Sequence, residues 1–208
     1  MGKVIKYGLI IAMIQLMLLC VLVRPSYVIK VMAAEGIKIE DTLGTKTLQT
    51  VDHYASDTFN SLFIKSGVYA TAWHMLVPTE GEHAQSNQIR LFNGIELWVQ
   101  DRINLMFTLI FLLCHRLTLM SLWLTSATEI LIMSAITGVL LRRIKQSNFA
   151  FASPTAHRVS IRILLVVIIL APFILSVPIA INPYIYPIAF LIMAFMIQAI
   201  IANVAKRI

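Results

Sequence analysis

The residue that most suggests chemistry is Glu129, a lone acid inside a long apolar stretch. Residues 117–141 contain this one acid and no Lys or Arg. Small and hydroxyl residues accompany it at helical spacings and complete a candidate face: Ser121, Thr125, Glu129, Ser134 and Gly138. Such residues on a membrane helix can pack against a neighbouring helix, bind a partner's helix, or take part in proton or ion translocation. We keep all three as alternatives for this face.

A second candidate surface follows the apolar stretch, where basic residues flank an apolar, aromatic segment. Residues 142–162 carry five positive charges and no acid. The sequence FAFASP within this loop is either a segment on the membrane surface or a docking peptide for a partner. The candidate docking residues are Arg142, Arg143, Phe149, Phe151 and His157.

Other residue types capable of catalysis form no recognised pattern in this sequence. The five histidines show no HExxH spacing and no Cys partner, which argues against a metal site. There is no nucleophile elbow and no Gly-rich loop for phosphate. Cys20 and Cys114 both lie in apolar runs, so no disulfide framework is expected. We therefore expect no enzymatic activity, no metal or other cofactor, and no small-molecule substrate.

The composition predicts an integral membrane protein. The chain has 208 residues, of which 59% are hydrophobic, and its mean hydropathy is +0.82. Its net charge of +7 could suggest nucleic-acid binding, but nine positive charges and no acid fall at the two termini and in residues 142–162. Residues 24–102 hold seven basic and nine acidic residues, a net charge of −2. We interpret the positive clusters as topology signals and expect no direct contact with nucleic acid.

The hydrophobic pattern predicts four transmembrane helices. The first covers residues 1–23 and is read as an uncleaved helix, because Arg24-Pro25 closes it without a nearby cleavage site. The last two form a hairpin over residues 163–208, with Pro172 and Pro178 as kinks and a basic C-terminus. The positive-inside rule places both termini and the 142–162 loop in the cytoplasm of a bacterium. The predicted location is the inner membrane.

Residues 103–141 allow two interpretations. As one helix of 39 residues they would extend roughly 58 Å and project out of a bilayer with a core of ~30 Å. As a hairpin of residues 103–121 and 122–141 they would place Arg116 deep in lipid, and the tip of the hairpin would lack a Gly, Pro or Asn turn. We favour the single long helix, which would be the second transmembrane helix.

Residues 24–102 are predicted to form a small helical extracytoplasmic domain. Apolar residues between Leu48 and Phe63 recur at spacings of three and four, which is typical of an amphipathic helix. Gly67 is expected to interrupt this helix, and a second helical piece follows it. The predicted fold is thus an all-α membrane protein with four transmembrane helices and a helical outer domain.

The order of these elements resembles a known family. A leading helix is followed by DHYA at residues 52–55 and FNSLFIKSG at residues 59–67. A membrane helix then passes through Glu129 into Arg142-Arg143, followed by Ser153-Pro154 and His157. This pattern is similar to inner-membrane proteins that conjugative plasmids and integrating conjugative elements encode beside the coupling ATPase of the transfer apparatus.

The resemblance implies a function in conjugative DNA transfer. It implies support of the coupling ATPase of a type IV secretion apparatus, without an activity of the protein's own. The partners expected on this basis are the lipid bilayer and that ATPase. The alternatives from other classes are a small transporter or channel component and a surface-interaction protein of the exclusion type.

Overall fold

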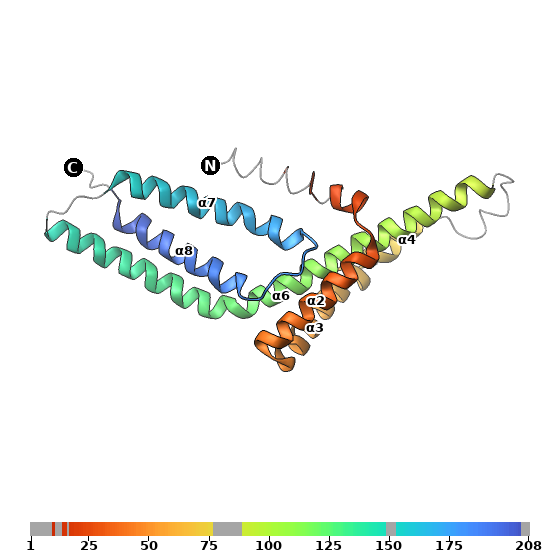
Figure 1. Ribbon diagram of the computed structural model, residues 1–208, viewed down its shortest axis with the longest axis horizontal. Coiled ribbons are helices and arrows are strands. Elements are labelled where there is room, and N and C mark those ends of the chain that lie inside the picture. Colours follow the sequence, from red (N-terminus) through yellow and green to blue (C-terminus); the bar gives the residue numbers. More distant parts are fainter. Residues whose placement is uncertain (1–9, 11–13, 16, 77–88, 149–152, 205–208) are drawn as a thin grey trace. The chain divides into compact units, whose positions relative to one another are not determined.

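The structure is a computed structural model in which every regular element is a helix, within the residues it describes: 10, 14–15, 17–76, 89–148 and 153–204. The elements in chain order are α2 (Pro25–Leu43), α3 (Thr45–Phe59), η1 (Asn60–Ile64), α4 (Val68–Leu76), α6 (Ile89–Ser147), α7 (Pro154–Ser176) and α8 (Ile185–Ala202) (Figure 1). The prediction of an all-helical chain is therefore confirmed for the described residues.

The chain divides into two compact units. Unit 1 comprises Met1–Thr118 together with Leu175–Asn182, and unit 2 comprises Leu119–Ile174 together with Pro183–Ile208. Helix α6 contributes residues to both units. The segment 175–182 belongs to unit 1, although the chain on either side of it belongs to unit 2.

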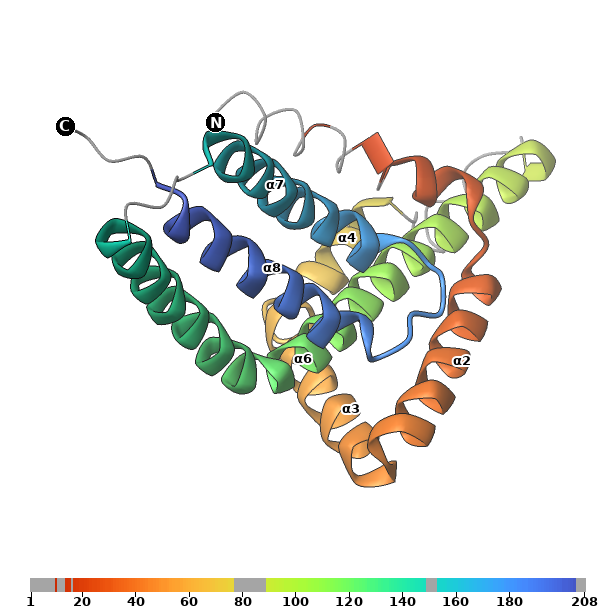
Figure 2. The ribbon, with the colours of Figure 1, turned by 60° about the vertical axis from the view of Figure 1, so that its left-hand side comes forward.

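Helices α2 and α3 of unit 1 form a hairpin around Gly44 (Figure 2). Gly44 has a φ of +87°, a conformation that residues with a side chain rarely adopt, so glycine permits this short turn. One face of α2 is buried at spacings of three and four: Val28, Val31, Glu35 and Ile39. Helix α2 was not predicted as a separate helix from the sequence, because Glu35 interrupts the apolar pattern on its buried face.

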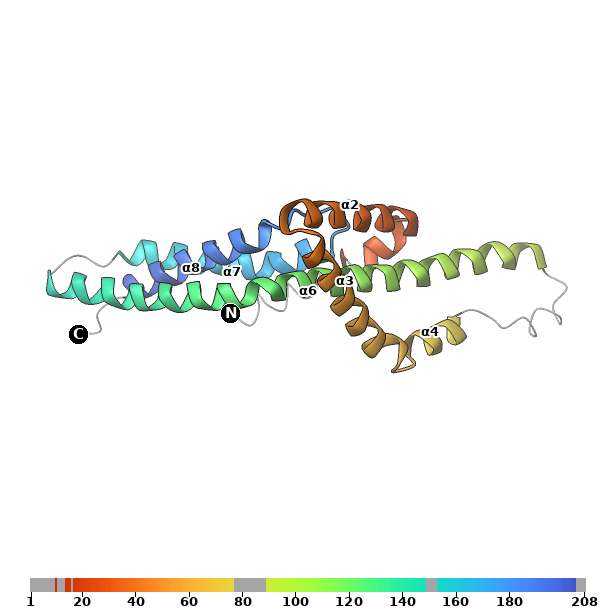
Figure 3. The same ribbon diagram turned by 90° about the horizontal axis from the view of Figure 1, so that it is seen from below.

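The predicted amphipathic helix between Leu48 and Phe63 corresponds to α3 and the π-helical turn η1. Gly67, with a φ of +77°, ends this helical stretch, and α4 begins directly after it. Figure 3 shows the change of direction between α3 and α4. The predicted interruption at Gly67 is thus confirmed.

Two groups of side chains hold unit 1 together. Val28 of α2 packs with Leu105, Leu109 and Leu112 of α6, and partly buried residues pack against this cluster: Leu19, Cys20, Val23 and Met32. Aromatic rings make a second group, with Phe59 and Phe63 at 5.5 to 6.4 Å from the rings of Phe107 and Phe111. Ring pairs at these separations stabilise helix contacts beyond their buried area. Both groups use the same part of α6.

Helix α6 is continuous across residues 103–141 and has 59 residues in all. The long-helix interpretation is confirmed, and the hairpin alternative is wrong. The helix starts earlier and ends later than the predicted bounds, because residues 89–102 and 142–147 contain no Pro to stop it. Its apolar part, Leu97–Ser147, is much longer than the ~20 residues that cross a bilayer.

Three described helices are long and apolar enough to cross a membrane: Leu97–Ser147, Pro154–Ser176 and Ile185–Ala202. They correspond to the second, third and fourth predicted spans. Most of the predicted first span, residues 1–23, lies outside the described residues, although residues 17–22 are helical. A membrane crossing by residues 1–23 therefore stays a prediction.

Unit 2 consists of α7, α8 and the C-terminal part of α6, which lie side by side (Figure 2). Helix α7 begins nine residues before the predicted span, with Pro154 as its first residue and the Ser153 hydroxyl accepting a hydrogen bond from the Ala156 N–H at 3.3 Å. Ser before Pro is a favourable helix start. The predicted loop over residues 142–162 is therefore largely helical, since α6 reaches Ser147 and α7 starts at Pro154.

Candidate functional site

The structure divides the predicted face on α6 into two sides. Ser134 and Gly138 are buried in unit 2, whereas Ser121, Thr125 and Glu129 are exposed. Successive residues of an α-helix are rotated by about 100°, so Glu129 and Ser134 lie about 140° apart around the axis. The five predicted residues therefore do not share one face.

The buried side of this part of α6 contacts α8. A Cβ atom added at Gly138 would lie 2.9 Å from the Ile201 Cβ and 3.0 Å from the Gln198 carbonyl oxygen. These distances leave no room for a side chain, and one of the contacting atoms is backbone. Gly138 is thus a helix-packing residue, as one of the sequence alternatives expected.

Glu129 points away from this contact and lies on the exposed side of α6. Within the part of the chain that the structure describes, its carboxylate has no hydrogen bond and no ion pair. The nearby Thr128 hydroxyl donates to the Thr125 carbonyl oxygen at 2.7 Å and is therefore satisfied within the helix. Glu129 is the residue of this side whose polar group most needs an external partner.

The predicted basic surface is held together by a few polar side chains at the end of unit 2. Asn203 Oδ1 accepts hydrogen bonds from Lys145 Nζ at 2.8 Å and from the Ser153 N–H at 3.3 Å. The His157 ring hydrogen-bonds through Nδ1 to the Ile200 carbonyl oxygen at 3.0 Å. These contacts bring together the end of α6, the start of α7 and the end of α8.

The remaining predicted docking residues differ in exposure. Arg143 is exposed and Arg142 is half-buried, while Arg158 of the same basic region is exposed on α7. Phe149 and Phe151 lie outside the described residues. The described part of the surface is therefore a basic patch on a fixed framework.

A buried ion pair that the sequence analysis did not identify is the most elaborate polar site in unit 1. Arg116 of α6 and Glu35 of α2 have side chains that are 0% and 1% exposed. Arg116 Nε donates to both Glu35 carboxylate oxygens at 3.2 Å, and Nη2 donates to Oε2 at 3.1 Å. A two-point pairing of this kind uses the planar fork of the guanidinium group.

The other donors of Arg116 bind backbone carbonyls of the segment 175–182. Nη1 donates to the oxygens of Leu175 and Val177 at 2.8 and 2.7 Å, and Nη2 donates to that of Ile179 at 2.7 Å. Lys38, three residues after Glu35, donates from Nζ to the Ala180 oxygen at 2.7 Å. These carbonyls lie at and beyond the end of α7, where the helix supplies no further donors. The Val177 oxygen also accepts the Ile179 N–H at 2.8 Å, and the side chains of Arg116 and Lys38 satisfy the others.

The sequence contained a signal for this site. Arg116 stands in an apolar run, and a buried guanidinium requires an acid. Glu35 lies on the buried, otherwise apolar face of α2. Each of the two charged residues interrupts an apolar pattern, and each supplies the ion-pair partner of the other. The separation of 81 residues between them hid the pairing.

Two further polar contacts join α6 to its neighbours in unit 1. The His115 ring lies 3.1 Å from an Asp52 oxygen of α3, measured from Nε2. Arg102 Nη1 donates to the carbonyl oxygens of Cys20, Val21 and Val23 at 2.8 to 3.0 Å, and so satisfies the end of the preceding helical stretch. Arg102, His115 and Arg116 of α6 thus each contact a different segment of unit 1.

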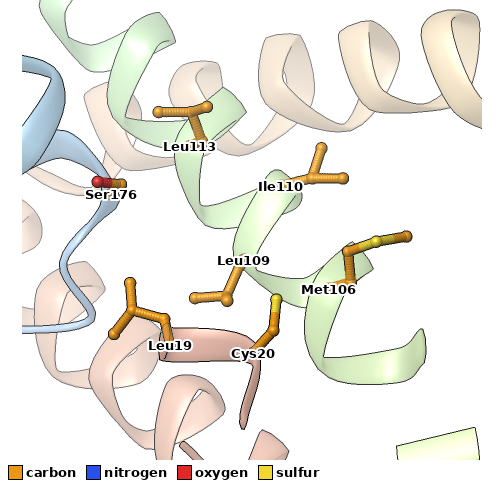
Figure 4. A pocket seen from close by; sticks show the side chains of 7 residues that line it. All are labelled: Leu19, Cys20, Met106, Leu109, Ile110, Leu113 and Ser176. Atoms are coloured by element: carbon orange, nitrogen blue, oxygen red, sulfur yellow. The ribbon is translucent and has the colours of Figure 1, made fainter. Parts of the chain in front are cut away.

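The pocket in Figure 4 has no chemistry of a binding site. Its volume is about 30 Å³, and its walls are Leu19, Cys20, Met106, Leu109, Ile110, Leu113 and Ser176. It is nearly all apolar and has room for about one water molecule. Among the described residues there is also no group of three or more His, Cys, Asp or Glu side chains that could hold a metal ion.

Comparison with known proteins supports the predicted resemblance. Residues 30–207 match the family model described as IncC plasmid conjugative DNA transfer protein DtrJ-like. This chain belongs to the DtrJ-like family. The match begins within α2 and extends past α8, so it includes both the Arg116–Glu35 pair and the basic surface. No curated protein and no solved structure matches the chain significantly.

Membership of the DtrJ-like family confirms that the chain resembles proteins of conjugative elements. The family description implies involvement in conjugative DNA transfer. The polar groups of unit 1 described above are used to position helices and a connecting segment.

Proposed function

We propose that this protein is a non-catalytic inner-membrane component that supports conjugative DNA transfer as a partner of the coupling ATPase of a type IV secretion apparatus. The family description supports the process, and the basic surface at the end of unit 2 supports the partnership. That surface is the single observation that carries the proposal, because it combines exposed charge with a fixed framework.

The framework matters because surface charge alone binds weakly. The Lys145 and Asn203 side chains and the Ser153 N–H form a hydrogen-bonded junction, and the His157 side chain adds a contact to the Ile200 carbonyl beside it. Arg143 and Arg158 project from the helices that this junction joins. Since their helices are already positioned, binding an acidic surface costs less conformational entropy than ordering a free loop would.

The proposed topology places this surface in the cytoplasm. A positively charged cluster after an apolar helix is retained on the cytoplasmic side. Counting back ~20 residues from Leu141 reaches Leu122, so Arg116 lies beyond the hydrocarbon core on the opposite side. Unit 1 residues around Arg116 and Glu35 are then extracytoplasmic, and the termini are cytoplasmic.

The first test removes two exposed charges without touching the junction. The double variant Arg143→Gln/Arg158→Gln should lower DNA transfer and co-purification with the coupling ATPase by roughly threefold to tenfold. Each exposed ion pair contributes only about 0.2–1 kcal/mol, so the effect is partial. A double variant with the same loss of charge in unit 1, Lys46→Gln/Lys65→Gln, is the matched control and should behave as wild type.

Topology must be checked in the same strains, because arginines next to a membrane helix also orient it. Alkaline phosphatase fused after Gln88 should be active, and fused after Gln146 it should be inactive, in both wild type and variant. Wild-type transfer and ATPase recovery from the Arg143/Arg158 variant would contradict the proposed docking surface.

A further inference from the structure

The outward side of α6 in unit 2 carries an unusual combination of residues. Ser121, Thr125, Glu129, Ile132 and Ile136 recur at spacings of four, four, three and four, and all are exposed. We call this stripe the Glu129 face. Glu129 lies 13 residues before Arg142, which is roughly 20 Å along the helix and near the middle of a bilayer core.

Arg116, the other charged residue in an apolar stretch of α6, is fully hydrogen-bonded within the protein. All five N–H donors of Arg116 have acceptors, two on Glu35 and three on backbone carbonyls. Glu129 has no donor among the described residues. A carboxyl group facing lipid is costly whether it is ionised or protonated, because its polar atoms have no partner there.

We infer that the Glu129 face binds a transmembrane helix of another protein that carries a Lys or Arg at the depth of Glu129. A cationic side chain matches the carboxylate in charge and in hydrogen-bond donors. The two groups relieve each other, since a lone Lys or Arg in the bilayer is as costly as a lone Glu. The apolar residues Ile132 and Ile136, which are 60% and 49% exposed, would pack around the pair.

The charge also argues against a second copy of this chain as the occupant. In a two-fold dimer the same residues face each other, so the Glu129 face would bring two carboxylates together. Like charges in a low-dielectric environment repel strongly. This inference goes beyond the proposed function, because it holds for any membrane protein of the transfer apparatus with such a helix.

The test uses a defined probe instead of an unidentified partner. Polyleucine transmembrane peptides with a central Lys, or with Leu throughout, are labelled and mixed with the full-length protein in lipid vesicles. Energy transfer reports their association. The Lys peptide should bind wild type about threefold more tightly than the Leu peptide, the gain expected from one average hydrogen bond between membrane helices.

Two variants separate the carboxylate from the rest of the face. Glu129→Leu should abolish the preference for the Lys peptide. Thr128→Val removes a neighbouring polar group whose hydrogen bond is internal to α6, so it should keep the preference. Glu129 has no partner among the described residues, so its loss should leave the thermal transition of the protein unchanged.

The opposite results are equally clear. No preference of wild type for the Lys peptide, or a preference that persists in Glu129→Leu, would overturn the inference. Energy transfer between two labelled copies of the chain that disappears in Glu129→Leu would also overturn it, because it would assign the face to self-association.

Discussion

At the scale of single residues, the buried Arg116–Glu35 pair fixes the segment 175–182 within unit 1. The Arg116 guanidinium binds Glu35 and three carbonyls of the segment 175–182, and Lys38 binds a fourth. A buried ion pair adds little net stability compared with apolar residues, but removal of one partner leaves an uncompensated charge. The site therefore specifies where the segment 175–182 lies more than it adds to total stability.

Arg116→Leu should destabilise the protein by about 3–5 kcal/mol, because Glu35 and the three carbonyls lose their donors together. The measurement is the thermal transition of the purified protein in detergent. The double variant Glu35→Leu/Arg116→Leu should recover only part of the loss, since the carbonyls of Leu175 and Ile179 lose their Arg116 donor and that of Val177 keeps only the Ile179 N–H.

Asp52→Asn is the matched control for that series. Asp52 also pairs with a side chain of α6, but its own side chain is 57% exposed, so the change should cost no more than about 1 kcal/mol. A full recovery by the double variant would contradict the importance assigned to the carbonyl contacts.

At the scale of elements, the sequence predicted those helices whose signals are local. The long α6 followed from an apolar run without turn residues, and the end of the helical stretch at Gly67 followed from that residue's freedom to adopt positive φ. Helix α2 was not predicted, because Glu35 interrupts its apolar stripe and its partner is 81 residues away. The division of the Glu129 face from Ser134 and Gly138 also needed the structure, since it depends on where α8 lies.

Gly138→Ala should destabilise the contact between α6 and α8 by about 1–3 kcal/mol, because the added methyl group would meet Ile201 and the Gln198 backbone. Gly36→Ala in α2 is the matched control. There the nearest atom to the new Cβ is a Leu48 methyl at 3.8 Å, so helix propensity should make the variant neutral or stabilised by about 1 kcal/mol. Thermal transitions measure both, and equal losses from the two variants would contradict the tight contact at Gly138.

At the scale of the whole molecule, the two proposals assign partners to two surfaces of the chain. The basic surface near Arg143 supports the proposed contact with the coupling ATPase, and the Glu129 face supports contact with a membrane helix. Composition and charge distribution predict a helical membrane protein, and three of the described helices are long and apolar enough to cross a membrane. The family match implies involvement in conjugative DNA transfer. The partner itself stays a proposal, because charge describes a complementary surface without identifying the protein that bears it.

The most direct test of the partnership is a cross-link formed during mating. A photoreactive amino acid at Gln146, exposed near the end of α6, should yield a product that contains the coupling ATPase. The same amino acid at Ile37, which is 61% exposed on α2, should not. If neither Gln146 nor the nearby exposed Val159 of α7 yields a product with the ATPase in cells that transfer DNA normally, the proposed partnership is contradicted.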